Sequence, residues 1–363
     1  VIWTNESYID NTYKTIMSGQ YFDKSAQPVG ENFVFPEFNG YSYRPSAQSL
    51  SDGNLLVSWI DSTYSDGVHD NKVYSQKFAP SVQWNEGVIL SNGYLIGPNV
   101  NLEGADLTGV DLTGADLTGV VSGGVLRGSE TIGLEAVGPV ESIFYAPERL
   151  SSPEILAFSG GGHLLAWSEG SVNAKGQLFN DDGQKVLDFN IVQNSSGEYI
   201  SGLKLTELDA GGFAAFWSEY SASSYVVKGR IFDSFGDPSG NDFIVSNSGS
   251  SYVQDVSQTS DGGFIVSWRS QISSGSGDDN YDAYAQKFNA DGQEVGSQFL
   301  LANAPGNQLY ASTAPHESDG FVAVWGGESS SQKSIEFQRF DDSGDPIFAK
   351  SLIRAIPYSA DSF

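Results

Sequence analysis

The chain has 363 residues, of which 45 are acidic and 18 are basic, giving a formal net charge of −27. This acidity argues against nucleic acid as a partner, because phosphate binding relies on Lys and Arg. No apolar run approaches the ~20 residues of a membrane helix, and the absence of cysteine excludes disulfides, thiolate catalysis and cysteine-ligated zinc. The 22 Phe, 17 Tyr and 7 Trp are enough for a hydrophobic core, which excludes a disordered acidic chain.

An internal repeat runs through the chain. An apolar strand that ends in Trp, usually after a Gly turn, recurs with its last residue at Trp3, Trp59, Trp167, Trp217, Trp268 and Trp325. A second strand that ends in Phe follows each of them, at Phe22, Phe78, Phe179, Phe232, Phe288 and Phe340. The period is roughly 50 residues, except for one interval of about twice that length, which indicates an insertion.

Each period contains four runs with the composition of β-strands. In the clearest copy these runs are Tyr252–Gln258, Gly263–Trp268, Ala283–Phe288 and Val295–Leu301. Asp261-Gly262 and Asp291-Gly292 lie between them and predict tight hairpin turns, in which Gly supplies the positive φ. Four short antiparallel strands in ~50 residues are typical of a β-propeller blade.

The repeat count predicts an all-β, six-bladed β-propeller. The final blade would take its first strand from Pro357–Phe363, which matches Arg44–Leu50, and its other three strands from the N-terminal segment. Closing the ring by this strand sharing leaves no exposed edge strand. The alternative is that Pro357–Phe363 completes the blade of a neighbouring chain and gives a polymer. Both remain open at this point, and closure within one chain is preferred.

Between the second and third complete copies of the Trp strand lies a run with a five-residue period. Leu recurs in it at Leu102, Leu107, Leu112 and Leu117. Such a period predicts a short right-handed β-helix with Leu inside, packed on the propeller. The predicted division is therefore propeller for 1–91, pentapeptide insertion for 92–148, and propeller again for 149–363.

The two repeats resemble known families. The DGGF-hydrophobic-SW and YxQxFDxxG patterns resemble repeats of large secreted bacterial surface proteins, including adhesins and proteins of the calcium-binding RTX type. The run NGYLIGPNVNLEGADLTG is similar to pentapeptide segments of cyanobacterial surface-type proteins. These resemblances imply an extracellular or cell-surface location. The glycine-rich nonapeptide that binds calcium in RTX proteins is absent from this sequence.

Two loops after Trp strands are rich in carboxylates and are candidates for Ca²⁺, which takes six to eight oxygen ligands. The predicted calcium ligands are Asp61, Asp66, Asp70, Asp278, Asp279 and Asp282. Neither loop has the spacing of an EF-hand, so a solvated acidic turn is the competing interpretation.

Tyrosines expected in the same kind of loop are predicted to stack on a glycan, namely Tyr64, Tyr220, Tyr225 and Tyr281. Two copies of the repeat also carry Trp-Ser-Glu, which places Glu169 and Glu219 at equivalent positions of neighbouring blades. A carboxylate pair can hydrolyse a glycoside, but these two are interpreted as surface glutamates. No Walker loop, GxSxG elbow or HExxH spacing occurs in the chain.

The regular repeat without a convergent polar site predicts a protein that is not an enzyme. We expect a structural or adhesive protein of the cell surface or matrix, with calcium-dependent self-assembly into a filament or layer. The expected partner is another copy of the chain or a cell-surface glycan. The first alternative is a carbohydrate-binding propeller, and the second is an enzyme that acts on polysaccharide.

Overall fold

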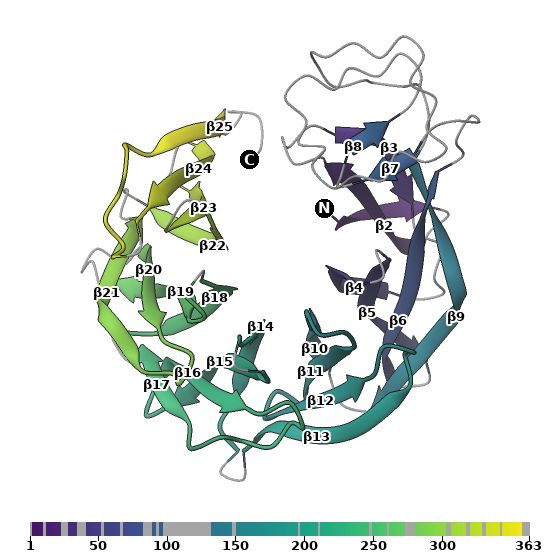
Figure 1. Cartoon of the computed structure of the whole chain (residues 1–363), viewed down its shortest axis with the longest axis horizontal. Helices are drawn as coiled ribbons and strands as arrows, with labels where there is room; N and C mark the ends of the chain where they lie inside the picture. The colour runs from purple at the N-terminus through teal and green to yellow at the C-terminus, as the bar shows by residue number, and fades with distance from the viewer. Residues whose placement is uncertain are drawn as a thin grey trace. The chain divides into compact units, whose positions relative to one another are not determined.

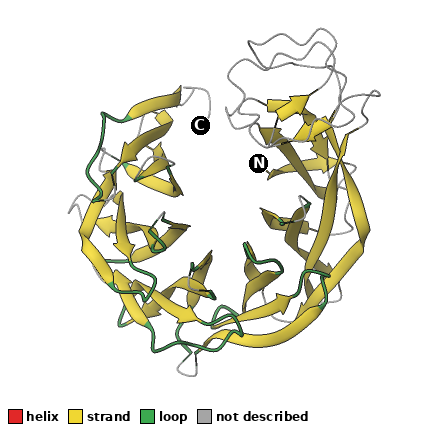
Figure 2. Cartoon of the chain, in the orientation of Figure 1, coloured by secondary structure: helices red, strands yellow, loops and turns green. Residues whose placement is uncertain are grey.

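The computed structural model describes residues 2–9, 12–22, 28–34, 41–51, 54–65, 68–82, 89–91, 94–96, 132–146, 150–194, 197–209, 211–246, 249–259, 261–272, 280–302, 306–316, 320–328, 332–341 and 343–357. These residues form β-strands and loops and contain no helix (Figure 2). The chain divides into two units, Val1–Pro147 and Glu148–Phe363. Among the described residues, no helix has the length and hydropathy needed to cross a membrane.

Unit 1 contains three sheets. A three-stranded sheet has the order β1 (Ile2–Ile9), β2 (Thr12–Phe22) and β3 (Pro28–Val34). A four-stranded sheet has the order β4 (Tyr41–Ser49), β5 (Leu55–Ser65), β6 (Val68–Val82) and β9 (Ile132–Ala146), and a small sheet pairs β7 (Ile89–Ser91) with β8 (Tyr94–Ile96). The range 92–148, predicted as the insertion, therefore includes β9, which is the fourth strand of a sheet.

Unit 2 consists of four antiparallel sheets of four strands each, in sequence order. They are β10 (Leu150–Ala157), β11 (His163–Glu169), β12 (Asn173–Phe179) and β13 (Lys185–Gln193); β14 (Ile200–Glu207), β15 (Phe213–Ser221), β16 (Ser224–Phe232) and β17 (Phe243–Ser246); β18 (Ser251–Gln258), β19 (Phe264–Ile272), β20 (Asn280–Phe288) and β21 (Glu294–Ala302); and β22 (Asn307–Pro315), β23 (Phe321–Glu328), β24 (Gln332–Phe340) and β25 (Ser351–Pro357). Figure 1 shows these sheets following one another along an arc, with the first strand of each on the concave side. The first strands of successive sheets contact each other. The predicted four-stranded antiparallel repeat is confirmed.

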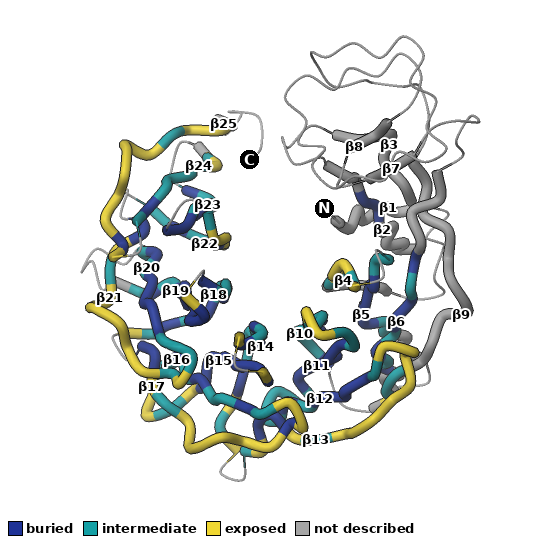
Figure 3. Tube along the Cα trace, viewed as in Figure 1, coloured by how far each residue is buried: buried dark blue, intermediate teal, exposed yellow. Residues whose placement is uncertain are grey.

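The core of unit 2 lies between successive sheets. Trp167, Trp217, Trp268 and Trp325 have at most 1% of their surface exposed. One hydrophobic cluster, for example, joins Leu164 and Ile191 of one sheet to Trp217 of the next. The second strands are buried along most of their length while the fourth strands are largely exposed (Figure 3). A strand with sheets on both sides buries both of its faces, which explains its continuous apolar sequence.

The glycine before each Trp strand is required by close packing. Gly212 has φ +86°, and a Cβ on it would lie 2.2 Å from the carbonyl oxygen of Phe232. The next residue, Phe213, stacks on the ring of Phe232 with 4.7 Å between centroids. The same Gly and Phe recur at Gly320 and Phe340, where the corresponding distance is 2.0 Å. The Gly turn and the repeat Phe therefore belong to one packing unit.

The first strand of each sheet in unit 2 carries a β-bulge. Pairing with the second strand shifts register between Ser151 and Glu154, and again between Ser201 and Lys204. The third and fourth sheets shift at Val253/Asp255 and Leu309/Ser312. Bulges turn side chains to new directions and are common beside active sites. They determine which side chains these strands present.

Candidate active site

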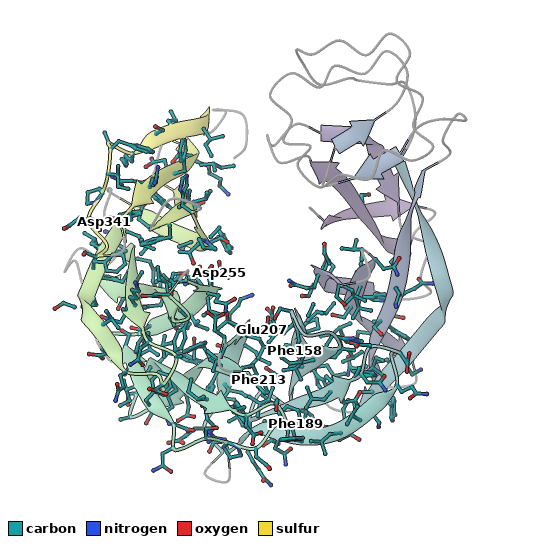
Figure 4. The ribbon with its side chains drawn as sticks, viewed as in Figure 1. Phe158, Phe189, Glu207, Phe213, Asp255 and Asp341 are labelled. Carbon is teal, nitrogen blue, oxygen red and sulfur yellow. The ribbon has the colours of Figure 1, made fainter. Side chains whose placement is uncertain are left out.

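The described residues bring three charged side chains together on neighbouring first strands. Glu154 lies on β10, Lys204 on β14 and Asp255 on β18, each directly after the bulge of its strand. We call these three residues the charged row. Each precedes the Trp of its own repeat by the same number of residues, and Ser312 occupies the equivalent position of β22. In Figure 4, Asp255 lies on the side of unit 2 along which the first strands run.

Glu154 and Lys204 of the charged row are in direct contact, and Asp255 attracts Lys204 electrostatically. The ammonium of Lys204 donates to Oε1 of Glu154 at 2.5 Å. On the other side, Oδ2 of Asp255 accepts hydrogen bonds from the Ser312 hydroxyl and from the backbone N–H of Thr313, both at 2.8 Å. Glu154 and Lys204 keep only 19% and 30% of their side-chain surfaces exposed. Three ionisable groups thus share a partly desolvated site.

Burial raises the pKa of both carboxyl groups of the charged row, Glu154 and Asp255. The pKa of Glu154 is raised by loss of solvation, which outweighs the opposing attraction of Lys204. The pKa of Asp255 is raised by the same cause, against the hydrogen bonds from Thr313 and Ser312. Burial by itself would lower the pKa of Lys204, but attraction to Glu154 and Asp255 outweighs it and the pKa is raised. Two carboxyls with raised pKa values beside a cation are typical of acid–base sites.

A second contact joins the first two sheets of unit 2 near the charged row. Glu207, at the end of β14, accepts hydrogen bonds from the backbone N–H and the hydroxyl of Ser159, each at 2.9 Å. Ser159 lies in the turn that follows β10, so this pair links that turn to the end of β14.

Three of the four predicted glycan tyrosines lie in one aromatic cluster. Tyr220 contacts Tyr225 at 5.2 Å between ring centroids, and Tyr225 contacts Tyr252 at 4.8 Å. The chain of rings continues from Tyr252 to Tyr281 at 6.1 Å. The guanidinium carbon of Arg269 lies 5.1 Å and 4.9 Å from the centroids of Tyr252 and Tyr281. We call these five residues the tyrosine cluster.

The predicted calcium ligands are only partly within the described residues. Asp61 lies on β5 and Asp282 on β20, where burial raises the pKa of Asp282. Asp66, Asp278 and Asp279 lie outside the described residues, as do the side chains of Asp70 and of the fourth tyrosine, Tyr64. Among the side chains that are described, no three of His, Asp or Glu converge as a metal site. Calcium binding therefore stays a prediction.

The two Trp-Ser-Glu glutamates each form an ion pair. Glu169 pairs with Lys175 at 2.6 Å. Glu219, interpreted from the sequence as a surface residue, is buried, pairs with Lys228, and accepts a hydrogen bond from Nε1 of Trp217 at 3.2 Å. The surface interpretation is wrong for Glu219, because only 4% of the residue is exposed. Its carboxylate satisfies the indole N–H of the Trp of its repeat.

Sequence reasoning missed the charged row. The sequence comparison considered the residues that follow each repeat Trp, whereas Glu154, Lys204 and Asp255 precede the Trp of their repeats. Aligning the first strands on their Trp would have shown Ser46, Glu154, Lys204, Asp255 and Ser312 in one column, a set of ionisable and hydroxyl side chains. The predicted residues Tyr220, Tyr225 and Tyr281 were expected in loops, but they lie on β15, β16 and β20. A search confined to loops therefore overlooked Tyr252 on β18 and Arg269 on β19.

Comparison with known sequences supports the short repeat. The family model of pentapeptide repeats matches residues 98–121, in 8 copies. The pentapeptide resemblance is therefore confirmed, although these residues lie outside the described part of the chain. No curated protein matches the chain significantly.

Comparison with solved structures shows a propeller-like fold. A polysaccharide lyase of family PL25, an ulvan lyase bound to -[GlcA(1-4)Rha3S]-, is similar with a TM-score of 0.53 and 7% identity, over 98% of this chain and 81% of that one. A protein of unknown function from Dyadobacter fermentans gives a TM-score of 0.48 and 11% identity, over 95% and 85%. The α-L-arabinanase of Penicillium chrysogenum, complexed with arabinobiose, gives 0.47 and 11%, over 81% and 77%.

These comparisons correct the predicted function. The expectation of a non-enzymatic structural or adhesive protein is contradicted by the similarity to the ulvan lyase, whose TM-score is 0.53. They also do not support the resemblance to RTX-type adhesins. The extracellular location and the glycan partner stay predictions.

Proposed function

We propose that the chain is a polysaccharide-acting enzyme that cleaves glycosidic bonds at the charged row. The observation that carries this proposal is the ion pair of Glu154 and Lys204, with Asp255 on the next first strand close enough to attract Lys204 and with the pKa of both carboxyls raised. The shared fold of an ulvan lyase supports it, since that fold accommodates polysaccharide chemistry. Ionisable groups that are partly buried at a cost to stability are typical of active sites.

The two carboxyl groups have different surroundings and therefore different roles. Asp255 receives two hydrogen bonds on one oxygen, which favours its carboxylate form as base or nucleophile. Glu154, with its raised pKa, donates a proton to the leaving glycosidic oxygen as the bond to the anomeric carbon breaks. The new bond at that carbon forms either to a water molecule that Asp255 deprotonates or to Asp255 itself, in which case water then hydrolyses the glycosyl ester. Lys204 holds Glu154 in place and balances the negative charge of the site.

The net charge of −27 favours an uncharged polysaccharide as substrate. A polyanion such as a uronate or sulfate polymer is repelled by a protein of the same sign. Elimination by a lyase needs the acidic proton beside a uronate carboxylate, so the same charge disfavours that reaction. Hydrolysis of a neutral polysaccharide is therefore the activity that agrees with both the carboxyl groups of the charged row and the negative charge of the protein.

The tyrosine cluster provides the binding surface in this proposal. Tyr252 is on β18, three residues before Asp255, and the cluster continues from it onto β15, β16 and β20. Tyrosine rings offer apolar faces to a sugar and a hydroxyl that hydrogen-bonds it. A chain held along these rings would lead towards the charged row.

A panel of polysaccharides tests the proposed function. Purified protein is incubated with arabinan, β-1,2-mannan and ulvan, and new reducing ends are measured alongside the ultraviolet absorbance of unsaturated uronate. We expect new reducing ends from a neutral polymer, loss of the signal in Glu154→Gln, and little change in the control Glu169→Gln. No turnover of any polymer, or full activity of Glu154→Gln, would refute the proposal.

We also propose that the sheets complete a six-bladed ring within one chain. The sheet β1–β3 has three described strands, and residues 358–363, which would add its first strand, lie outside the described residues. Pro357, the expected start of that strand, ends β25 opposite Gln332. Light scattering should give the mass of a single chain. A larger assembly that dissociates when 358–363 are deleted would instead indicate strand exchange.

A further inference from the structure

Tyr310 combines exposure with a strained backbone. Its side chain is 76% exposed, more than any other large apolar or aromatic side chain among the described residues. Its φ is +57°, in the left-handed region that a bulky side chain avoids. The equivalent bulges of β10 and β14 place Ser152, with φ +52°, and Gly202, with φ +69°, in this conformation. A glycine would suit the position better, so the tyrosine is kept there against a conformational cost.

The strained residue is tied to the charged row. The backbone N–H of Tyr310 donates to Oε1 of Gln254 at 2.7 Å, and Gln254 immediately precedes Asp255 on β18. Two residues after Tyr310, the hydroxyl of Ser312 donates to Asp255. The side chains of Gln254 and Asp255 therefore fix the same bulge of β22 from the neighbouring sheet. The backbone of Tyr310 is therefore held by the strand that carries Asp255.

The neighbouring sequence leaves room for the ring. Cδ2 of Tyr310 is 4.0 Å from the place that a Cβ on Gly326 would occupy. Gly326 follows the repeat Trp of this sheet, at the position that Arg269 has in the preceding sheet. The larger side chain is absent here, and the ring of Tyr310 lies over the glycine instead. This arrangement presents an aromatic ring to solvent without burying it.

We propose that Tyr310 is a sugar-stacking residue that binds one ring of a neutral polysaccharide beside the charged row. This inference rests on the proposed function, of which it specifies the substrate subsite. An exposed ring adds little to folding, so packing gives no reason for the strained backbone. Stacking on the apolar face of a sugar gives such a reason, because it uses an accessible ring in a fixed position. Functional sites are where such local strain is retained.

Binding without turnover provides the test. Native electrophoresis is run through gels that contain arabinan or β-1,2-mannan, and the retardation of each variant gives a dissociation constant. We expect Tyr310→Gly to bind about tenfold more weakly and Tyr310→Phe to bind as the wild type does. The control Tyr199→Ala removes another exposed tyrosine, with 56% of its surface accessible, and should not affect retardation.

Thermal unfolding separates a binding role from a structural one. Because glycine relieves the strain at φ +57°, Tyr310→Gly should melt at the same temperature as the wild type or a few degrees higher. A clearly lower melting temperature together with weak binding of Tyr310→Phe would overturn the inference, as would unchanged retardation of Tyr310→Gly. Failure of the enzyme proposal is distinguishable, because retardation that depends on Tyr310 can be measured in a protein that cleaves nothing.

Discussion

Replacing Asp255 by asparagine should lower the rate of polysaccharide cleavage by a factor of about 10²–10⁴. The change removes the carboxylate that acts as base or nucleophile but keeps an oxygen that accepts from Ser312 and Thr313. The fold should remain intact, so the loss is a loss of chemistry. Initial rates on the polymer that the wild type cleaves provide the measurement. Asp188→Asn is the matched control, because Asp188 is 57% exposed and pairs only with nearby Lys185.

The same variant should be more stable than the wild type at neutral pH. Burial raises the pKa of Asp255 above its ordinary value of 3.8, so the folded chain holds this proton more tightly than the unfolded chain. The wild type therefore loses stability as the pH rises from 3.8 through the raised pKa. Asparagine does not titrate, so the stability gained by Asp255→Asn should be absent at low pH and complete above that window.

Urea denaturation of both proteins across this pH range shows whether Asp255→Asn is more or less stable than the wild type. The other charged groups of the site, Glu154 and Lys204, are present in both proteins, and their ion pair is retained. A structural ion-pair network would give the opposite result, because removing one partner leaves a buried charge uncompensated. A variant that is less stable than the wild type at neutral pH, with its activity unchanged, would remove Asp255 from the proposed mechanism.

Replacing Trp217 by alanine should lower the free energy of unfolding of unit 2 by about 3–5 kcal/mol. The side chain is fully buried in the cluster between the first two sheets of this unit. Its loss would leave a cavity and would remove the Nε1 hydrogen bond to the buried Glu219. Urea denaturation followed by circular dichroism measures the change.

A surface aromatic of the same unit serves as the control for Trp217. Phe235 is 73% exposed, and Phe235→Ala should change stability by less than about 0.5 kcal/mol. Trp217→Phe should fall between the two, because it fills most of the volume but donates no hydrogen bond. If Trp217→Ala were as harmless as Phe235→Ala, the sheet-on-sheet core described above would be incorrect.

The sequence alone was sufficient for the strands and turns of unit 2. The predicted strand Tyr252–Gln258 is β18 to within one residue, and the predicted turn glycines Gly262 and Gly292 have positive φ values of 81° and 76°. These features depend on local pattern: continuous apolar residues for a strand covered on both faces, and Gly where the chain turns. Because each repeat has the same pattern of apolar residues and turn glycines, every copy supports the same prediction of strands and turns.

The sequence pattern did not separate the insertion from the strand β9, which lies within the predicted range. The predicted insertion 92–148 includes residues 132–146, which follow the matched repeats 98–121 and pair with β6 as β9. Their sequence contains two glycines and a proline and lacks the clear signature of the other fourth strands. Pairing with a strand some sixty residues earlier is what makes them part of a sheet.

The sequence was enough to establish an acidic, repeated, all-β chain with a pentapeptide segment, and to predict the Trp and Phe residues that fill the core of the repeats in unit 2. The packing of the sheets was needed to show that Glu154, Lys204 and Asp255 lie on neighbouring first strands, and that Tyr252 and Arg269 join the predicted tyrosines. The physical reason is that these side chains come from strands of different repeats, roughly 50 residues apart, and meet only when the first strands of successive sheets pack together. The bulges that orient them arise from strand pairing, which a local sequence pattern does not record.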